Sequence, residues 1–279
     1  MTVSAQSLLS GARFDPSTGL FEWTPSAPGS ERVTFSASDI TQTSTTADVA
    51  IQAGDATPVV ESLENAASGS REAVCSSGGL ATIRGGWLSN GTAADSSGQS
   101  RLIGGTQVLV NGTAVAMVLA SPMAVSFACP EALVGTTLSV AVQTAAGRSA
   151  ALTTAMRDSA LGIFPLAVSI LESGRIATAR DARNAGEPAQ PGDVLQIAVT
   201  GLPADADPAL VTVQLGDVPI QAQWIRPMRG AVGVTQIGIT LPGATPVGDS
   251  VPLAVLRRLP SGQLATSQTS LAAFEAVRQ

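Results

Sequence analysis

An internal repeat limits the folds open to this chain more than any other feature of its sequence. Four landmark residues in the middle of the chain return further on after an almost constant number of residues. The pairs and their steps are Gly78 and Gly192 (114), Leu88 and Leu202 (114), Pro130 and Pro242 (112), and Val142 and Val255 (113). A step this steady, and longer than a solenoid repeat, indicates two copies of one domain-sized unit.

Both copies have the pattern of β-strands joined by turns. Apolar and polar residues alternate over short runs such as 106–110 and 137–143, Gly and Pro punctuate them, and no segment keeps a helical period. We therefore expect an all-β protein of tandem Ig-like antiparallel β-sandwich domains, two of them related by internal duplication. The expected domains are 1–55, a partial Ig-like repeat, and two sandwiches at 56–165 and 166–279.

The expected strands can be placed approximately from the alternation. They are 80–84, 106–110, 114–119, 124–129, 137–143 and 149–156 in the first copy, and 194–199, 210–215, 218–225, 232–240, 250–257 and 264–274 in the second. Between the copies, 161–165 is expected to be a bridge. In both copies the apolar residues are mainly Val, Leu, Ile and Ala, since aromatic residues are only 3% of the chain.

The first 54 residues are too short for a full sandwich. A turn at 15–19 (Asp-Pro-Ser-Thr-Gly) separates Phe14 from a strand at 20–23, because Pro fixes φ and Gly supplies a positive φ. Strands near 33–37 and 47–51 follow. The run F-D-P-x-T-G-x-F-x-W-T-P from Phe14 resembles the Ig-like, cadherin-like repeat of bacterial surface proteins. The resemblance covers the later part of that repeat and implies that its first strands lie upstream.

A second resemblance covers about residues 59–279. Its motifs are N-A-A-S from Asn65, V-x-V-N-G from Val108, S-P-x-x-V-x-F-x-x-P from Ser121, G-I-F-P from Gly162 and T-G-L from Thr200. This ordered series resembles the uncharacterised C-terminal domain of exported acidobacterial (Solibacter-type) proteins, from which the chain departs at Ser77 and Cys129. The resemblance implies surface or secreted β-sandwich modules and supplies no catalytic residues.

Missing residue types exclude most catalytic machinery. The sequence has no His, Lys or Tyr, so Ser-His-Asp, Cys-His, Ser-Lys and Schiff-base arrangements are excluded. A glycosidase-like carboxylate pair remains, with Asp205 and Asp207 as candidates, although a solvated turn is the simpler interpretation. We expect no enzyme and no cofactor. The net charge of −6 also argues against nucleic acid, whose phosphates require clustered cations.

The only two cysteines are candidates for a disulfide. Cys75 comes just before the expected strand at 80–84, and Cys129 ends the strand at 124–129. Such strand ends can meet at one pole of a sandwich, and an exported protein is oxidised. Two separate thiols remain the alternative. Two thiols without any His are too few ligands for a zinc site.

Ligand-binding candidates are weaker. Asp39 and Asp55 are calcium candidates at the end of the first unit, but no D-x-D-x-D loop surrounds them, and solvated acids are the alternative. Trp87, in a Gly-Gly-Trp-Leu bend, and the nearby Asn90 are candidates for sugar binding. Trp23 and Trp224 lie in apolar runs and are expected to pack inside. Asn111 with Gly112 is expected to form a hairpin turn.

These observations favour a non-catalytic structural or adhesive segment of a larger exported bacterial surface protein. The loops 89–100 and 226–234 are its expected exposed loops. The start of the chain lacks the pattern of a signal peptide and no run is apolar enough to span a membrane, so we expect a piece of a longer secreted or cell-surface chain. The alternatives are a carbohydrate- or small-ligand-binding module, a glycosidase-like enzyme and a self-associating sheet edge. A surface glycan or a protein is the expected partner.

Overall fold

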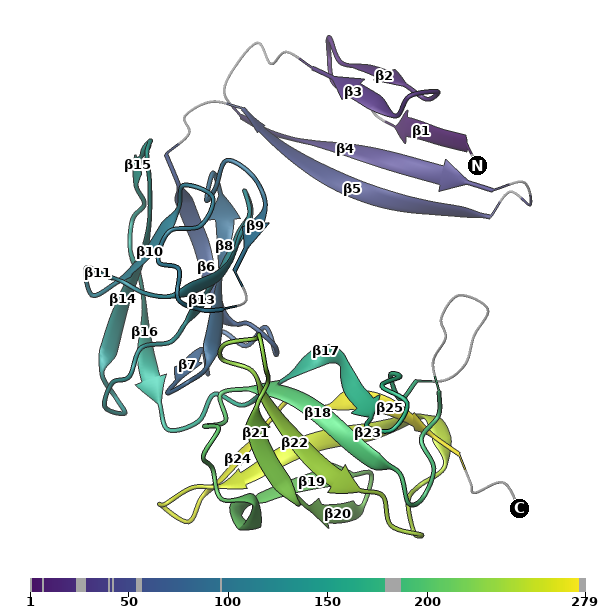
Figure 1. Ribbon diagram of the computed structural model, residues 1–279. Coiled ribbons are helices and arrows are strands. Elements are labelled where there is room, and N and C mark those ends of the chain that lie inside the picture. Colours follow the sequence, from purple (N-terminus) through teal and green to yellow (C-terminus); the bar gives the residue numbers. More distant parts are fainter. Residues whose placement is uncertain are drawn as a thin grey trace. The chain divides into compact units, whose positions relative to one another are not determined.

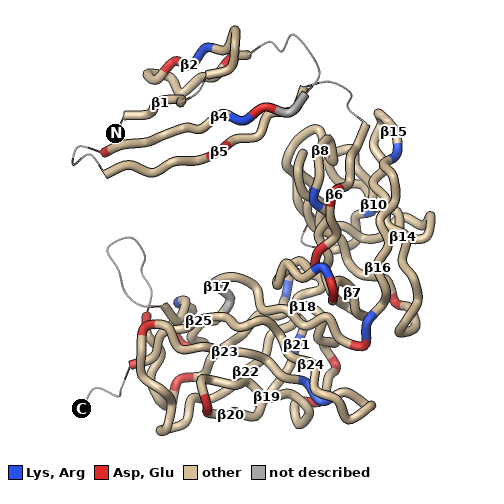
Figure 2. Tube along the Cα trace, turned by 180° about the vertical axis from the view of Figure 1, so that it is seen from behind, with Lys and Arg blue, Asp and Glu red and all other residues tan. Residues whose placement is uncertain are grey.

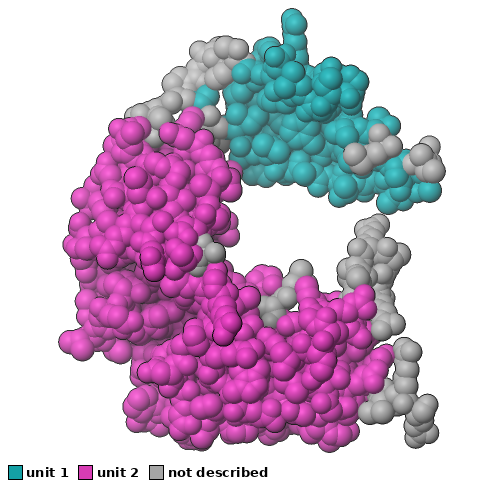
Figure 3. Space-filling model, in the orientation of Figure 1, with its two compact units in different colours: residues 1–56 teal, residues 57–279 magenta. Residues whose placement is uncertain are grey.

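The computed structural model of the 279-residue chain describes all residues except 1, 7, 24–28, 40, 42, 54–56, 96, 179–186 and 276–279. The chain divides into two compact units, Met1–Ala56 and Thr57–Gln279 (Figure 3). In the described residues every regular element is a β-strand apart from the short 3₁₀ turn η1 (Pro208–Leu210), so the protein is all-β, as the sequence predicted (Figure 1). No helix in that part of the chain is long and apolar enough to cross a membrane.

The first unit is a small sheet with a hairpin packed on it. Its strands are β1 (Thr2–Gln6), β2 (Arg13–Asp15), β3 (Leu20–Glu22), β4 (Gly29–Ser38) and β5 (Ser44–Ala53). Strands β1-β4-β5 form an antiparallel sheet, and β2 pairs with β3 across the predicted turn. The rings of Phe14 and Phe21 lie 5.4 and 5.8 Å from that of Phe35 in β4, so aromatic contacts hold the hairpin against the sheet.

The first sandwich of the second unit has two sheets. Its strands are β6 (Val59–Asn65), β7 (Cys75–Ser76), β8 (Leu80–Gly86), β9 (Ala93–Ala94), β10 (Gln107–Val110), β11 (Thr113–Ala114), β12 (Met117–Ala120), β13 (Ala124–Ala128), β14 (Thr137–Thr144), β15 (Gly147–Arg148) and β16 (Leu152–Arg157). The sheets have the orders β6-β8-β13-β12-β9 and β11-β10-β14-β16-β7. The predicted turn joins β10 to β11, with positive φ values at both Asn111 (49°) and Gly112 (81°), as a type I′ hairpin requires.

The second sandwich repeats this arrangement. Its strands are β17 (Gly162–Ile170), β18 (Val194–Thr200), β19 (Val211–Leu215), β20 (Val218–Gln221), β21 (Trp224–Pro227), β22 (Thr235–Thr240), β23 (Gly248–Arg258), β24 (Leu264–Thr266) and β25 (Ser270–Phe274). The sheets have the orders β17-β18-β22-β21 and β20-β19-β23-β24, with β25 also paired to β23.

The strand orders confirm the internal duplication. Within one sheet, the order β17-β18-β22-β21 of the second sandwich corresponds to β6-β8-β13-β12 of the first. Within the other sheet, β20-β19-β23-β24 corresponds to β11-β10-β14-β16. The corresponding strands β8 and β18 begin at Leu80 and Val194, which is again a step of 114 residues. The repeat seen in the sequence is therefore a repeat of topology.

The structure corrects the expectations from the sequence at two places. The predicted bridge at 161–165 belongs to strand β17, so the second sandwich begins before the predicted boundary at 165/166. Pro165 falls where the pairing of β17 with β18 is irregular, between Ile163 and Val168, and such an irregularity accommodates a residue without an N–H. The single strand expected at 218–225 is two strands in different sheets.

Each sandwich has its own core of aliphatic side chains. One cluster runs from Leu63 to Met156 and the other from Leu161 to Phe274. Phe127 and Phe274 are the aromatic members of these clusters, as the low aromatic content predicted. Charged residues are few and scattered along the trace (Figure 2), so most of the surface between them is built from small polar and apolar side chains.

Candidate functional site

Cys75 and Cys129 form a disulfide that joins the two sheets of the first sandwich. Their sulfur atoms are 2.07 Å apart and their Cα atoms 5.6 Å apart. Cys75 lies in β7, at the edge of one sheet, and Cys129 follows β13 of the other. Both residues belong to the buried core. The disulfide thus fixes the short strand β7, which makes only two ladder pairs with β16.

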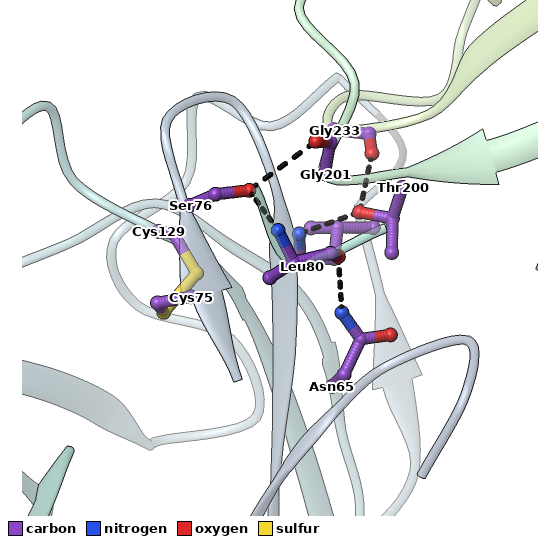
Figure 4. Close-up of a disulfide and its surroundings, with 9 residues drawn as sticks. Asn65, Cys75, Ser76, Leu80, Cys129, Thr200, Gly201 and Gly233 are labelled. Atoms are coloured by element: carbon purple, nitrogen blue, oxygen red, sulfur yellow. Dashed lines mark hydrogen bonds between the residues drawn. A yellow bond between two sulfur atoms is a disulfide. The ribbon is translucent and has the colours of Figure 1, made fainter. Parts of the chain in front are cut away.

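The residue after Cys75 begins a buried polar joint between the two sandwiches (Figure 4). The hydroxyl of Ser76 accepts a hydrogen bond from the backbone N–H of Ala160 (3.0 Å) and donates one to the carbonyl of Gly201 (3.3 Å). Ala160 lies in the segment that leads into the second sandwich, and Gly201 follows β18. Ser76 therefore holds the connecting segment and the second sandwich together, and the disulfide holds Ser76 in place.

Asn65, at the end of β6, also binds the connecting segment. Its amide Nδ2 donates to the carbonyl of Ala160 (2.7 Å), while its Oδ1 accepts from the backbone N–H groups of Ala67 (3.0 Å) and Ser68 (2.9 Å). The side chain is 2% exposed. A buried amide with this many partners fixes its neighbours, because losing it would leave several buried groups unpaired.

Thr200 forms the third contact of the joint. Its hydroxyl accepts from the N–H of Leu80 in the first sandwich (2.7 Å) and donates to the carbonyl of Gly233 in its own (2.9 Å). The adjoining glycines leave no room for side chains. A Cβ at Gly201 would lie 2.1 Å from the carbonyl oxygen of Ala160, and one at Gly233 would lie 2.5 Å from Cγ of Leu80. The two sandwiches therefore approach closely at these glycines, and the hydroxyl of Thr200 pairs with backbone groups of both.

The sequence contained these joint residues without revealing their role. Asn65 and Thr200 occur in the N-A-A-S and T-G-L motifs, where the alternation predicts only strand ends. A detectable signal was the combination of Thr200 with Gly201 directly after an apolar strand, since Gly201 has a φ of 73° and a tight approach of this kind requires glycine.

The predicted sugar-binding residues Trp87 and Asn90 lie in the bend after β8. Trp87 is half-buried and has a φ of 58°, which is unusual for a bulky residue, and Asn90 is exposed. Leu88, which lies between them, is fully buried. Its backbone N–H donates to the carbonyl of Pro122 (3.0 Å), and its carbonyl accepts from the hydroxyl of Thr106 (2.6 Å). These two hydrogen bonds fix the shape of the bend.

The predicted acidic sites differ in what the structure describes. Asp39 closes the β4–β5 hairpin, where its Oδ1 accepts from the N–H and hydroxyl of Thr41 and the N–H of Thr43, and the Thr41 hydroxyl chiefly lowers the pKa of Asp39. Asp55 lies outside the described residues. Asp207 caps the 3₁₀ turn through Ala209 (2.9 Å), and Asp205 is exposed beside it. Among the described residues no three potential ligands cluster as a metal site.

Trp224 lies differently from the sequence prediction. It starts β21 and sits half-buried on the face of the β17-β18-β22-β21 sheet that points away from the core. The indole lies against the backbone of Gly238, where a Cβ would come within 1.9 Å of the ring. The guanidinium of Arg226 covers the ring, with Cζ 4.1 Å from its centroid. Trp224 is therefore a surface support for an arginine, instead of a core residue.

A chain of hydrogen bonds continues from this arginine across the sheet. Arg226 Nε donates to Gln236 Oε1 (3.3 Å), and Gln236 Nε2 donates to Gln196 Oε1 (3.0 Å). Beside these groups is a pocket of about 420 Å³. We call it the Arg226 pocket, and its lining residues are Gln196, Arg226, Pro227, Met228, Arg229 and Gln236. Four of the six side chains offer N–H donors, and none is a carboxylate.

Comparisons with known proteins do not place the chain in a family. No family model and no curated protein matches it. Among solved structures it is similar to the SGBP-B protein of the Bacteroides ovatus mixed-linkage glucan utilization locus, in complex with a mixed-linkage heptasaccharide (12% identity, 99% of this chain and 60% of that chain, TM-score 0.36). It is also similar to domains 5-6 of the S-layer protein SbsC (12%, 78% and 99%, 0.27) and to the BSP domain of a biofilm associated protein (13%, 95% and 45%, 0.31). The chain thus spans 60% of the first of these proteins.

Proposed function

We propose that this chain is a non-catalytic structural and adhesive β-sandwich segment of a larger exported bacterial cell-surface protein. The observation that carries the proposal is the joint described above, in which Ser76, Asn65 and Thr200 fix two sandwiches to each other through buried hydrogen bonds. A segment that transmits force or presents loops gains from such a fixed connection. The disulfide supports an oxidising location, and the absence of His, Lys and Tyr disfavours catalysis.

The joint can be tested by hydrogen exchange on the full chain. We expect amides of β8 and β18 next to the joint to exchange together, and Thr200→Val to uncouple them, because it leaves the N–H of Leu80 and the carbonyl of Gly233 unpaired. Thr153→Val, at an exposed position of β16, is the control. Independent exchange of the two sandwiches in the unmodified protein would contradict the rigid-segment proposal.

The location has its own test. Protease added to intact cells of the source bacterium should release peptides from this chain. If only lysed cells release them, the chain lies inside the cell and the surface proposal is wrong.

Carbohydrate binding is a second candidate function, and one observation favours it. The Arg226 pocket combines two arginines, two amides and a volume of about 420 Å³, which falls within the range of roughly 300–1,000 Å³ typical of ligand pockets. The test is tryptophan emission of the full chain, titrated with a panel of neutral and acidic polysaccharides. A response that disappears in Trp224→Phe but persists in Trp87→Phe would support binding at this pocket, and no response to any glycan would remove this function.

A further inference from the structure

The Arg226 pocket presents almost only hydrogen-bond donors. Each guanidinium of Arg226 and Arg229 has five N–H groups and no acceptor. The hydrogen-bond chain from Arg226 uses the oxygen of Gln236 and then that of Gln196, so the NH₂ group of Gln196 stands at its end. A ligand for these groups must supply acceptors, and a carboxylate does so best because it can accept two parallel hydrogen bonds from one arginine.

The charge of the pocket differs from that of the protein. The chain has a net charge of −6, yet no carboxylate lines this pocket, and Arg226 forms no salt bridge with the described residues. Two arginines in an acidic chain match one or two negative charges on a ligand. They do not match a dense polyanion such as nucleic acid, which would need many more cations.

The pocket is also formed in advance. Trp224 and Gln236 hold Arg226 by stacking and by a hydrogen bond, so little side-chain freedom is lost on binding. Met228 and Arg229 belong to the loop after β21, which is closed by a hydrogen bond from Met228 N–H to the carbonyl of Val234 (2.9 Å). The same loop reaches the first sandwich at Gly98, where a Cβ would lie 2.1 Å from the Val232 side chain. This contact with the first sandwich also holds the loop that forms one wall of the pocket.

These observations identify the class of ligand. We propose that the Arg226 pocket binds the carboxylate of an acidic saccharide, a uronic acid residue of a surface polysaccharide. Arg226 holds the carboxylate, while the Gln196 amide and Arg229 donate to ring hydroxyls and ring oxygen. Because Arg226 covers the indole, Trp224 positions the arginine and is not the surface on which the sugar stacks.

A saccharide fits this pocket better than an acidic peptide does. Extended peptides are recognised through backbone pairing at a sheet edge and apolar holes for side chains. This pocket lies on the face of a sheet, beside its edge strand β21, and its apolar lining is limited to Pro227, Met228 and the stems of the arginines. This inference rests on the carbohydrate-binding candidate above and adds the requirement for a carboxylate.

The experiment compares two forms of one sugar. The full chain is titrated by calorimetry with an oligogalacturonide and with the same oligomer after full methyl esterification, which masks each carboxylate. We expect esterification to weaken binding by about tenfold or more, since a charge-assisted bidentate contact is lost. Arg226→Gln should cause a similar loss, and Arg226→Lys an intermediate one. The matched control is Arg84→Gln, which replaces an exposed arginine on the corresponding sheet of the first sandwich. It should leave the affinity for the oligogalacturonide unchanged.

The other outcomes distinguish the two proposals. Equal binding of the esterified oligomer would overturn the carboxylate assignment and leave carbohydrate binding standing. Binding of neither form, nor of any neutral glycan, would overturn both. If hexaglutamate competes as well as the oligogalacturonide, recognition is by charge alone and the saccharide assignment is wrong. Circular dichroism and a thermal melt of each variant show that it is folded.

Discussion

The two sandwiches share one topology, but the side chains on their corresponding outer faces make different contacts. In the first, a cross-strand row of Glu64, Thr82, Ser126 and Leu119 faces away from the core; in the second, the corresponding row is Ser169, Gln196, Gly238 and Trp224. Thr82 and Gln196 are separated by the step of 114 residues found in the sequence. The duplication therefore lets each position be compared with its own counterpart.

The first row is satisfied within the protein. The hydroxyls of Thr82 and Ser126 are 2.9 Å apart, and Glu64 is bonded to Ser62 (2.8 Å) and paired with Arg71 (3.0 Å) and Arg84 (3.6 Å). Such a face has few groups left for a ligand. It also belongs to the sandwich that the disulfide stabilises.

The second row is left open. Gly238 in place of Ser126 makes space for an indole, and the indole supports an arginine that has no carboxylate partner among the described residues. One copy therefore has a self-paired face, while the other presents donors that an outside partner could satisfy.

The largest expected effect is removal of the disulfide. The Cys75→Ser/Cys129→Ser double variant should destabilise the first sandwich by ~4 kcal/mol, because the bond closes a loop with a sequence separation of 54 residues. Hydrogen exchange measured on the full chain should show the largest loss in β13, next to Cys129, whereas β8 and β18 should still exchange together through the joint. A loss in β13 no larger than that in β22 would show that the disulfide does not act mainly on the first sandwich.

The next effect is at the joint. Asn65→Ala should destabilise the second unit by about 2–3 kcal/mol, because the carbonyl of Ala160 and the N–H groups of Ala67 and Ser68 lose buried partners. Denaturant unfolding followed by circular dichroism measures this change. Asn90→Ala, at an exposed position, serves as the control, and a cost at Asn65 no larger than at Asn90 would remove the joint as a source of rigidity.

The strand pattern made the fold predictable but not the site. Alternation located most strands, since one side of each sheet faces an apolar core. It failed at β17, where Pro165 interrupts the pairing. It also treated Ile220 and Trp224 as one strand, whereas the chain crosses between sheets at 222–223. A break of this kind resets which side chains face the core, so the alternation places Trp224 in the interior and gives no sign of its contacts with Gly238 and Arg226.

The cysteine pair shows what the sequence does contain. The pattern places both cysteines at strand ends, which approach each other at the poles of a sandwich, and together with the expected export it favours a disulfide over two separate thiols; the structure contains that disulfide. The Arg226 pocket has no comparable signal, because Gln196, Arg226 and Gln236 come from three strands whose register only the folded sheets define.

A smaller effect should follow from filling the space under Trp224. Gly238→Ala should cost about 1–2 kcal/mol, because the added methyl overlaps the indole and the gain in strand propensity offsets only part of the strain. It should also shift the tryptophan emission and weaken any ligand of the Arg226 pocket. Ser126→Ala, its counterpart in the first sandwich, loses one hydroxyl contact and should leave the emission unchanged. Identical spectra for both variants would show that Trp224 does not rest on Gly238.

The smallest expected effect is a difference in acid sensitivity between the two faces. Partial burial raises the pKa of the Glu64 carboxyl, but hydrogen bonds from Ser62 and Arg71 and the charges of Arg71 and Arg84 outweigh it, so the pKa lies below its ordinary 4.5. A lowered pKa stabilises the fold above the unfolded value, and that contribution is lost as the pH falls through the folded value. We therefore expect the melting temperature of the first sandwich to fall on acidification below about pH 4.5, and Glu64→Gln to flatten this part of the profile. Arg226→Gln should leave the pH profile of the melting temperature unchanged, since no carboxylate faces that arginine from the pocket lining. If Arg226→Gln flattened the profile as Glu64→Gln does, an acid would lie against Arg226 in solution, and the second face would be self-paired like the first.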